Sequence, residues 1–147
     1  MSDLAAMKVK LLRAGARMPT RATPGSTGLD LYACLEEPGY VDIGPDPTLV
    51  PTGFAMEMPE GYDIQVRPRS GLGRQGVTLI YGTIDSDYRG EIFISMHTFG
   101  TRQTYRIQNG DRIAQLVVSR AVIMPVEEVP ELGASERGAG GHGSTGR

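Results

Sequence analysis

The stretch Tyr62-Asp63-Ile64-Gln65-Val66-Arg67 decides the fold of this chain. Tyr62, Ile64 and Val66 alternate with charged or amide side chains, and a period of two puts all three on one face of a β-strand. We therefore predict a strand here with an apolar face toward a core and a polar face away from it.

Further strand signals lie on both sides of this stretch. Residues 8–11 alternate, and apolar side chains repeat at period two through residues 54–58. Residues 91–96 and 113–118 are nearly continuous apolar runs, which are typical of strands covered on both faces. Gln115 is the exception inside the second run.

The 20 glycines and 10 prolines interrupt the chain every few residues, and few intervals could hold an ordinary helix. The one helix candidate is a turn near residues 70–74. This composition predicts a single all-β domain, built as a sandwich, jelly roll or distorted barrel with tight turns. A length of 147 residues suits one domain.

The charge and cysteine content exclude some functions. A net charge of -2 argues against a general nucleic-acid binder, although a few arginines suffice for a phosphate ligand.

Cys34 is the only cysteine, so we expect a small buried side chain and no intramolecular disulfide. We see no signal peptide and no apolar run of membrane-spanning length, and we expect a cytoplasmic protein without a membrane partner.

The composition changes near Pro125. Residues 125–130 predict an extended connector, and five of the eleven residues 137–147 are glycine. Such a segment cannot offset its ordering entropy by burial. We therefore divide the chain into a β domain at 1–124 and a connector with a mobile arm at 125–147.

The arm also carries groups that bind phosphate. Glycine N–H groups, the hydroxyls of Ser144 and Thr145 and the guanidinium of Arg137 would suit a phosphate clamp. From this segment alone a disordered terminus is favoured, because glycine-rich ends are common and the lysine of a phosphate loop is missing.

Residues 82–91, read as a hairpin, leave two interpretations open. Asp85 or Asp87 could be a base that activates water. Equally, Ser86 and Asp87 could be ordinary turn formers and Arg89 a surface charge. Elsewhere, Asn109 and Gly110 predict a second hairpin turn, which favours structural over catalytic roles for Asp111 and Arg112.

Five stretches in order resemble the motifs of the trimeric dUTPase family, from about Pro24 to Arg147. They are GLDLYA at 28–33, RPRSGLG at 67–73, GTIDSDYRGE at 82–91, GDRIAQL at 110–116 and RGAGGHGSTG at 137–146. Chance agreement across all five is not credible.

The resemblance implies a β jelly roll that assembles as a homotrimer with three shared active sites. The C-terminal arm of one chain closes a site on another. The implied reaction hydrolyses dUTP to dUMP and pyrophosphate by attack of water on the α-phosphorus, which limits uracil in DNA and supplies dUMP for dTMP synthesis. Mg²⁺ is the implied cofactor, held by the triphosphate and waters with no direct protein ligand.

The resemblance also assigns roles to residues. Asp85 would be the general base, and Tyr88 would pack on the deoxyribose and exclude a 2'-hydroxyl. The remaining substrate contacts would come from the backbone at Ile80, Tyr81 and Gly82 (uracil), from Arg69, Ser70, Gly71 and Gln115 (phosphates), and from Arg137, His142, Gly143, Ser144 and Thr145 of the arm. Asp30 would support either the water shell of the metal or the scaffold of the site.

Two features depart from the family pattern. His142 stands where phenylalanine is common, so an imidazole would stack on uracil and could add a pH dependence near neutrality, or it could merely tolerate exposure. The second is the short stretch 76–82, which resembles family members with a short hairpin.

Two rival functions remain. One is a dCTP deaminase of the same fold, although its members tend to be longer and lack this arm and the tyrosine-bearing segment. The other is a non-catalytic nucleotide-binding regulator, against which the presence of Asp85 and the whole arm argues.

Overall fold

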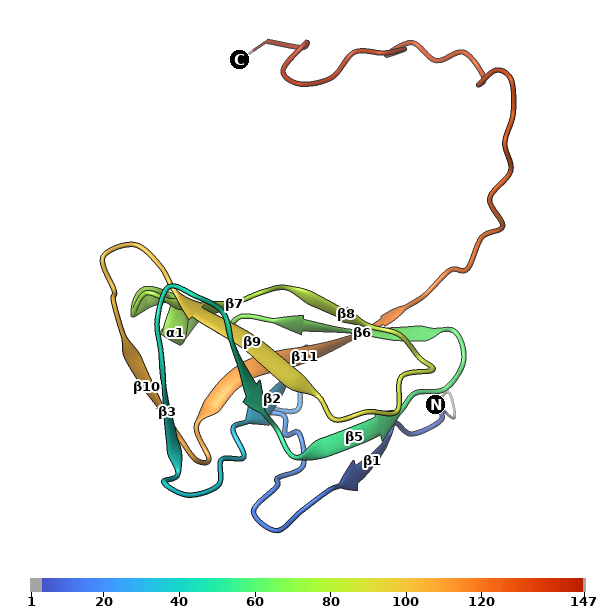
Figure 1. The fold of residues 1–147 in the computed structure, drawn as a ribbon. Helices are drawn as coiled ribbons and strands as arrows, with labels where there is room; N and C mark the ends of the chain where they lie inside the picture. Colours follow the sequence, from blue (N-terminus) through green and yellow to red (C-terminus); the bar gives the residue numbers. More distant parts are fainter. Residues whose placement is uncertain (1–3, 147) are drawn as a thin grey trace.

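The computed structural model describes residues 4–146 and confirms an all-β chain (Figure 1). Residues 1–3 and 147, the outer ends of the two predicted segments, lie outside the described part. The elements are β1 (Lys8–Leu11), β2 (Leu29–Tyr32), β3 (Tyr40–Ile43), β4 (Thr48–Pro51), β5 (Phe54–Glu57), β6 (Tyr62–Arg67), α1 (Ser70–Arg74), β7 (Val77–Leu79), β8 (Gly82–Ile84), β9 (Phe93–Thr98), β10 (Tyr105–Gln108) and β11 (Arg112–Arg120).

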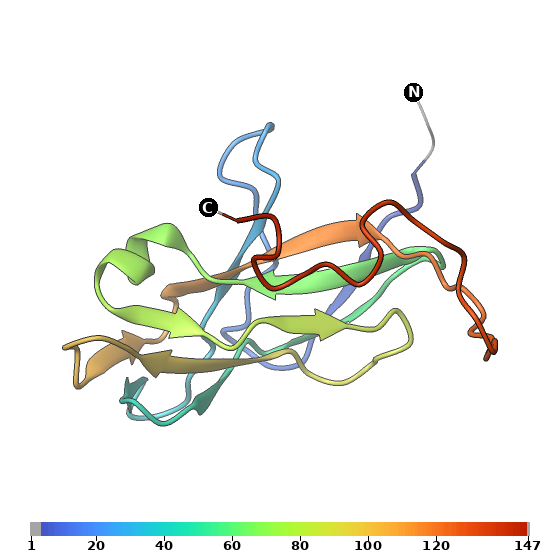
Figure 2. The same ribbon diagram turned by 90° about the horizontal axis from the view of Figure 1, so that it is seen from above.

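The strands form two larger and two smaller antiparallel sheets. The order is β2-β11-β6-β8 in one sheet and β4-β9-β7 in another, while β1 pairs with β5 and β3 with β10. Figure 2 shows β6 lying beside β11, as their register from Gln115↔Arg67 to Arg120↔Tyr62 requires.

One core lies between the two larger sheets. Leu31, Ile64 and Leu116 come from the four-stranded sheet and belong to the same buried cluster as residues of the three-stranded sheet, Val50, Ile94 and Met96. All six are at most 1% exposed. In β6 the predicted alternation is confirmed, because Ile64 and Val66 are buried and Tyr62 packs against the core.

The predicted two-sided burial of residues 91–96 is wrong. The strand there begins at Phe93, which is 47% exposed, whereas Ile94 and Met96 are buried. β9 therefore has one core face and one outer face. In β11 the prediction holds better, since Ile113, Ala114, Leu116 and Val117 are all buried.

The predicted hairpins at 76–82 and 82–91 do not form. β7 pairs with β9, whereas β8 pairs with β6 in the other sheet. Ile80 makes the last bond to β9, from its N–H to the Ser95 carbonyl at 2.8 Å. The chain then crosses between sheets at Ile80 and Tyr81. Turn residues mark where a strand ends but not which strand it pairs with, which depends on distant packing.

The turn at Asn109 and Gly110 exists, but it does not close a hairpin. Gly110 has a φ of +84° and its N–H donates to the Ala33 carbonyl at 2.8 Å. The strands on either side separate, because β10 pairs with β3 and β11 pairs with β2 and β6.

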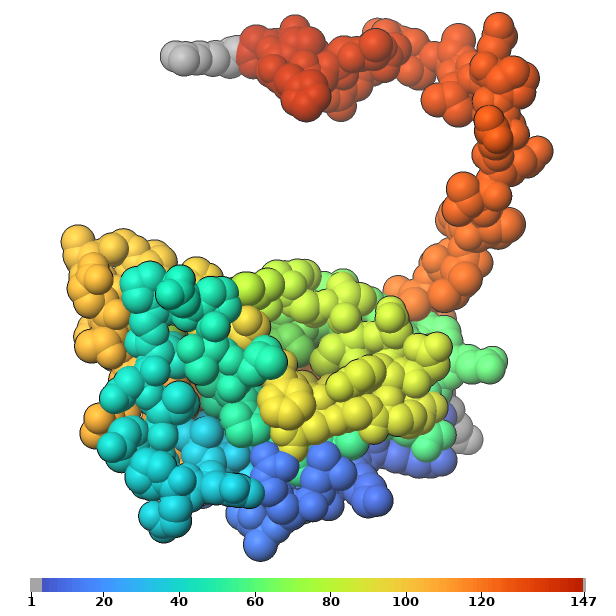
Figure 3. Space-filling model, in the orientation of Figure 1, coloured from blue at the N-terminus to red at the C-terminus, as the bar shows by residue number. Residues whose placement is uncertain are grey.

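The C-terminal arm leaves the body after β11. The N–H of Ala121 donates to the Gly61 carbonyl at 3.0 Å, and residues 122–139 are all exposed. Figures 1 and 3 show the arm standing away from the sheets.

Cys34 is buried, as predicted. Within residues 4–146, no helix is long and apolar enough to cross a membrane.

Candidate active site

A pocket of about 380 Å³ opens where β8 and β9 separate. The chain crosses to the other sheet at Ile80 and Tyr81, so β8 and β9 belong to different sheets and a space is left between them beside the core. The lining residues are Val66, Ile80, Tyr81, Gly82, Thr83, Ile84, Asp85, Tyr88, Glu91, Ile92, Phe93, Ile94 and Ser95. The volume suits a small ligand, and the lining combines apolar side chains with a few polar ones.

Tyr88 is held in one orientation within this pocket. Its hydroxyl donates to the carbonyl oxygen of Glu91 at 2.9 Å. Gly90 makes this position possible, because a Cβ there would lie 2.4 Å from the hydroxyl oxygen and 2.6 Å from the ring. The ring is 45% exposed, so it can meet a ligand.

Asp85 follows β8 directly and is exposed at the pocket. Ser86 and Asp87 form the turn after it, with the Tyr88 N–H donating to the Asp85 carbonyl at 3.1 Å. Arg89 donates to the Ser86 carbonyl at 2.7 Å. Within residues 4–146 the Asp85 carboxylate forms no ion pair, so it is available to accept a proton from water.

The crossing segment is fixed by the side chain of Tyr81. Its hydroxyl bonds to Gln65 and accepts from Arg67 Nε at 3.2 Å, and the Arg67 guanidinium lies 5.9 Å from the ring centroid. The backbone of Ile80, Tyr81 and Gly82 is thereby held against the pocket.

A second group of predicted residues meets where β2, α1 and β11 come together. Asp30 lies between two guanidiniums, at 3.5 Å from Arg69 Nε and 3.5 Å from Arg112 Nη1. Arg69 also donates to the Arg112 carbonyl at 3.1 Å. Ser70 begins α1 and is exposed, as is Gly71. The Asp30 carboxylate is already shared by two cations, so it fits a scaffold better than a metal shell.

Gln115 belongs to the same group, because the pairing of β11 sets it opposite both Asp30 and Arg67. Its amide donates to the Pro68 carbonyl at 3.0 Å. Gly28 leaves the space for this amide, since a Cβ there would lie 2.4 Å from Gln115 Oε1.

The end of the arm folds on itself in successive turns. Arg137 Nε donates to the Gly140 carbonyl at 2.6 Å, and the Gly140 N–H donates back to the Arg137 carbonyl at 3.1 Å. A Cβ on Gly140 would lie 3.0 Å from Ser144 Oγ. His142, with a φ of +52°, and the exposed Gly143 and Thr145 complete this part.

One chain thus holds the predicted site in three separate parts. Asp85, Tyr88 and the 80–82 backbone share the pocket, but Arg69, Ser70 and Gln115 do not line it, and neither does any arm residue. The sequence did not single out Glu91 and Phe93 as pocket residues. Glu91 is the last residue of the motif at 82–91, so the motif pointed to Glu91, whereas no local sequence pattern pointed to Phe93.

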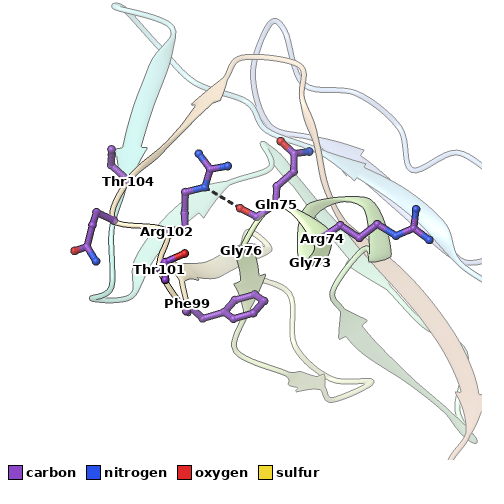
Figure 4. A pocket seen from close by; sticks show the side chains of 10 residues that line it. Gly73, Arg74, Gln75, Gly76, Phe99, Thr101, Arg102 and Thr104 are labelled. Atoms are coloured by element: carbon purple, nitrogen blue, oxygen red, sulfur yellow. Dashed lines mark hydrogen bonds between the residues drawn. The ribbon is translucent and has the colours of Figure 1, made fainter.

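A larger hollow lies elsewhere and does not suit hydrolysis (Figure 4). It measures about 630 Å³ and is lined by residues 73–76 and 99–104. No carboxylate or histidine lines it, so it offers no side-chain base. Arg102 Nε is bonded to the Gln75 carbonyl at 2.8 Å, and Arg74 points away from Arg102 in Figure 4.

No group of three or more His, Cys, Asp or Glu residues within the described part of the chain could hold a metal ion. A metal that acts here would need most of its ligands from a substrate and from water.

The fold and the pocket define a class: an all-β protein of jelly-roll type with a pocket of small-ligand size beside the carboxylate of Asp85. The dUTPase family model matches residues 14–146. The chain therefore belongs to the dUTPase family.

Individual relatives agree with this assignment. The chain is 48% identical over 132 residues to the deoxyuridine 5'-triphosphate nucleotidohydrolase of Desulfotalea psychrophila, covering 88% of this chain and 87% of the relative. A mutant dUTPase of Staphylococcus bacteriophage 80alpha, solved with dUpNHpp, matches with a TM-score of 0.84 and 29% identity over 97% of this chain and 99% of that one. A dUTPase from phage phi11 of S. aureus, described with a structural Mg(II) ion, matches with a TM-score of 0.76 and 26% identity over 86% and 98%.

Proposed function

We propose that this protein hydrolyses dUTP to dUMP and pyrophosphate. Its relatives are named deoxyuridine 5'-triphosphate nucleotidohydrolases, which supports dUTP as the substrate. The observation that carries the proposal is the pocket in which the free carboxylate of Asp85, the fixed ring of Tyr88 and the backbone of residues 80–82 lie together. The reaction would limit uracil in DNA by removing dUTP, and its product dUMP would be available for dTMP synthesis.

Asp85 acts as the general base in this proposal. A water molecule loses a proton to the carboxylate while its oxygen bonds to the α-phosphorus. The bond from that phosphorus to the bridging oxygen breaks, and pyrophosphate leaves. A base with no competing cation suits this role, and proton transfer of this kind contributes about 10²–10⁴-fold to a rate.

Tyr88 and the crossing backbone select the nucleoside. The ring, held by Glu91 and Gly90, would lie on the deoxyribose and leave no room for a 2'-hydroxyl. Polar groups of residues 80–82 would pair with the uracil edge. Cytosine would leave such groups unpaired, which discriminates more strongly than a lost apolar contact, while a thymine methyl would clash.

The phosphates are held by the other two parts of the site. Arg69, Ser70, Gly71 and Gln115 would contact the chain of phosphates, and Arg137, Ser144 and Thr145 would reach the γ-phosphate, with His142 and Gly143 at the uracil ring. Mg²⁺ bound to the triphosphate would neutralise charge on the leaving pyrophosphate. Asp30 would serve as scaffold, which its ion pairs with Arg69 and Arg112 support.

The division of the site supports a homotrimer with exchanged arms. Val122, Ile123, Met124, Val126 and Leu132 are between 73% and 99% exposed along the connector, an apolar row that one chain leaves uncovered. Exposed apolar surface of this kind marks a contact with another molecule. Residues 125–147 would cross to a neighbour and bring Arg137 and Ser144 to its pocket, while residues 1–124 remain in the β domain. We place the trimer in the cytoplasm, where Cys34 would stay reduced.

A substrate panel with Mg²⁺ tests this function. Pyrophosphate should be released from dUTP far faster than from dTTP, dCTP or UTP. Ammonia released from dCTP would instead identify a deaminase. Binding of dUTP without any turnover would identify a regulator.

A further inference from the structure

An ion pair joins the candidate site to the distant N-terminal part of the chain. Arg13 Nη1 donates to Glu91 Oε1, across 78 positions of sequence. The Glu91 side chain is only 11% exposed and that of Arg13 is 31% exposed. Glu91 lines the pocket and also a second hollow of about 410 Å³ that Arg13 and Cys34 line too.

Arg13 is held on a rigid support. The N–H of the preceding residue, Leu12, donates to the Gly53 carbonyl at 2.8 Å. Gly53, with a φ of +75°, packs so closely that a Cβ would lie 2.8 Å from Ala16 Cβ and 2.9 Å from Cys34 Sγ. Arg13 Nε is buried and forms no hydrogen bond within the described residues, and the guanidinium reaches Glu91 through Nη1 alone. The hydrogen bond that Arg13 donates to Glu91 also raises the pKa of Arg13 above its ordinary value.

Within the described residues, the segment 85–92 is tied to the rest of the chain by hydrogen bonds at its end, at Glu91 and Ile92. Ile92 anchors its end, with its N–H donating to the Phe54 carbonyl at 3.0 Å and its carbonyl accepting from Thr52 Oγ1 at 2.6 Å. One residue earlier, the Glu91 carbonyl accepts the Tyr88 hydroxyl at 2.9 Å. Arg13 therefore fixes the side chain of Glu91, and the backbone carbonyl of Glu91 orients Tyr88.

We infer that Arg13 is a positioning residue for sugar discrimination: by holding Glu91, it keeps the Tyr88 ring where a 2'-hydroxyl is excluded. This inference rests on the proposed function. Arg13 touches no substrate in this role. A partly buried carboxylate that loses its partner is left uncompensated and must rearrange, and small displacements in a site can cost up to about 10²-fold in rate.

The test compares the ratio of kcat/KM for dUTP to kcat/KM for UTP in Arg13→Ala, Arg13→Lys and Glu91→Gln, together with the melting temperature. We expect Arg13→Ala to lower this ratio about tenfold, mainly because UTP is accepted more readily while dUTP is positioned less well. Arg13→Lys restores most of the ratio, since an ammonium can still pair with Glu91. Glu91→Gln, which keeps the shape and removes the charge, falls between these two.

Arg106→Ala is the matched control. It removes an arginine that makes a two-point ion pair with Asp42, at 2.8 and 2.9 Å, on the β3–β10 sheet and outside the pocket. Its substrate ratio should equal that of the wild type.

A lower melting temperature with an unchanged substrate ratio in the Arg13 variants would overturn the inference and leave the pair a structural one. If Arg13→Ala does not fold, Arg13→Lys and Glu91→Gln decide the matter by the same ratio. Failure of the wild type to hydrolyse dUTP would refute the proposed function itself, which is a separate outcome.

Discussion

A Cβ on residue 28 would lie only 2.4 Å from Gln115 Oε1, so the Gln115 side chain fills the space beside Gly28. Gly28 precedes β2 and Gln115 lies in β11, so a glycine in one motif makes room for the amide of another. The same amide donates to Pro68 in a third motif. These contacts bring three stretches that are far apart in sequence close together in space.

Gly28→Ala should therefore disturb Gln115 and lower kcat/KM for dUTP by about 10–100-fold, since misplaced binding groups cost rate. Steady-state kinetics measure this. Gly25→Ala is the control, because a Cβ at Gly25 meets nothing within 4 Å. Equal activity of the two variants would contradict a role for Gln115 in binding.

Asp85→Asn should reduce turnover by about 10²–10⁴-fold, because the amide cannot take a proton from water. Binding of dUpNHpp should persist, which calorimetry can follow. The neighbouring Asp87→Asn serves as control, since Asp87 lies in the turn and outside the pocket lining. Near-normal turnover of the Asp85 variant would remove it from the role of base.

The strands could be predicted from the sequence, because alternation such as that of residues 62–67 is a local property and the buried face follows from it. The pairing of the strands could not. Residues 80 and 81 look like part of a hairpin, yet the chain changes sheets there, and the partner strands β6 and β9 are chosen by packing across the core.

For the candidate site, the order of five motifs predicted its residues, but their separation within one chain was visible only in three dimensions. Arg13 shows the limit most clearly. No local pattern marks it, and its partner Glu91 lies 78 positions away.

The ion pair of Asp42 and Arg106 predicts a pH effect on stability. The Arg106 hydrogen bond lowers the pKa of the Asp42 carboxyl below its ordinary value. A carboxyl whose pKa is depressed by folding adds stability above its unfolded pKa of about 4, and that stability is lost as the pH falls through the lower, folded pKa. Asp42→Asn should thus lower the melting temperature slightly at pH 7 and make no difference in strong acid. A constant difference at every pH would contradict this reasoning.

Deletion of residues 137–147 should abolish most activity, because Arg137 and Ser144 would no longer reach a neighbouring pocket. The melting temperature should stay close to that of the full chain, since every hydrogen bond from residues 122–146 stays within the arm. Light scattering would report whether the oligomer survives. Loss of the oligomer would show that residues 137–147 are structural.

His142 provides the last prediction, which concerns substrate binding. Its φ of +52° lies in the left-handed region that favours glycine, so a side chain at this position strains the backbone. An imidazole ring can stack on uracil, and that contact would offset the strain.

We therefore expect the KM of His142→Phe for dUTP to stay close to that of the wild type, because this variant keeps a stacking ring. His142→Gly relieves the backbone but removes the ring, so its KM should be higher, and steady-state kinetics measure both values. A low KM for His142→Gly would show that the ring itself makes no contact with the base.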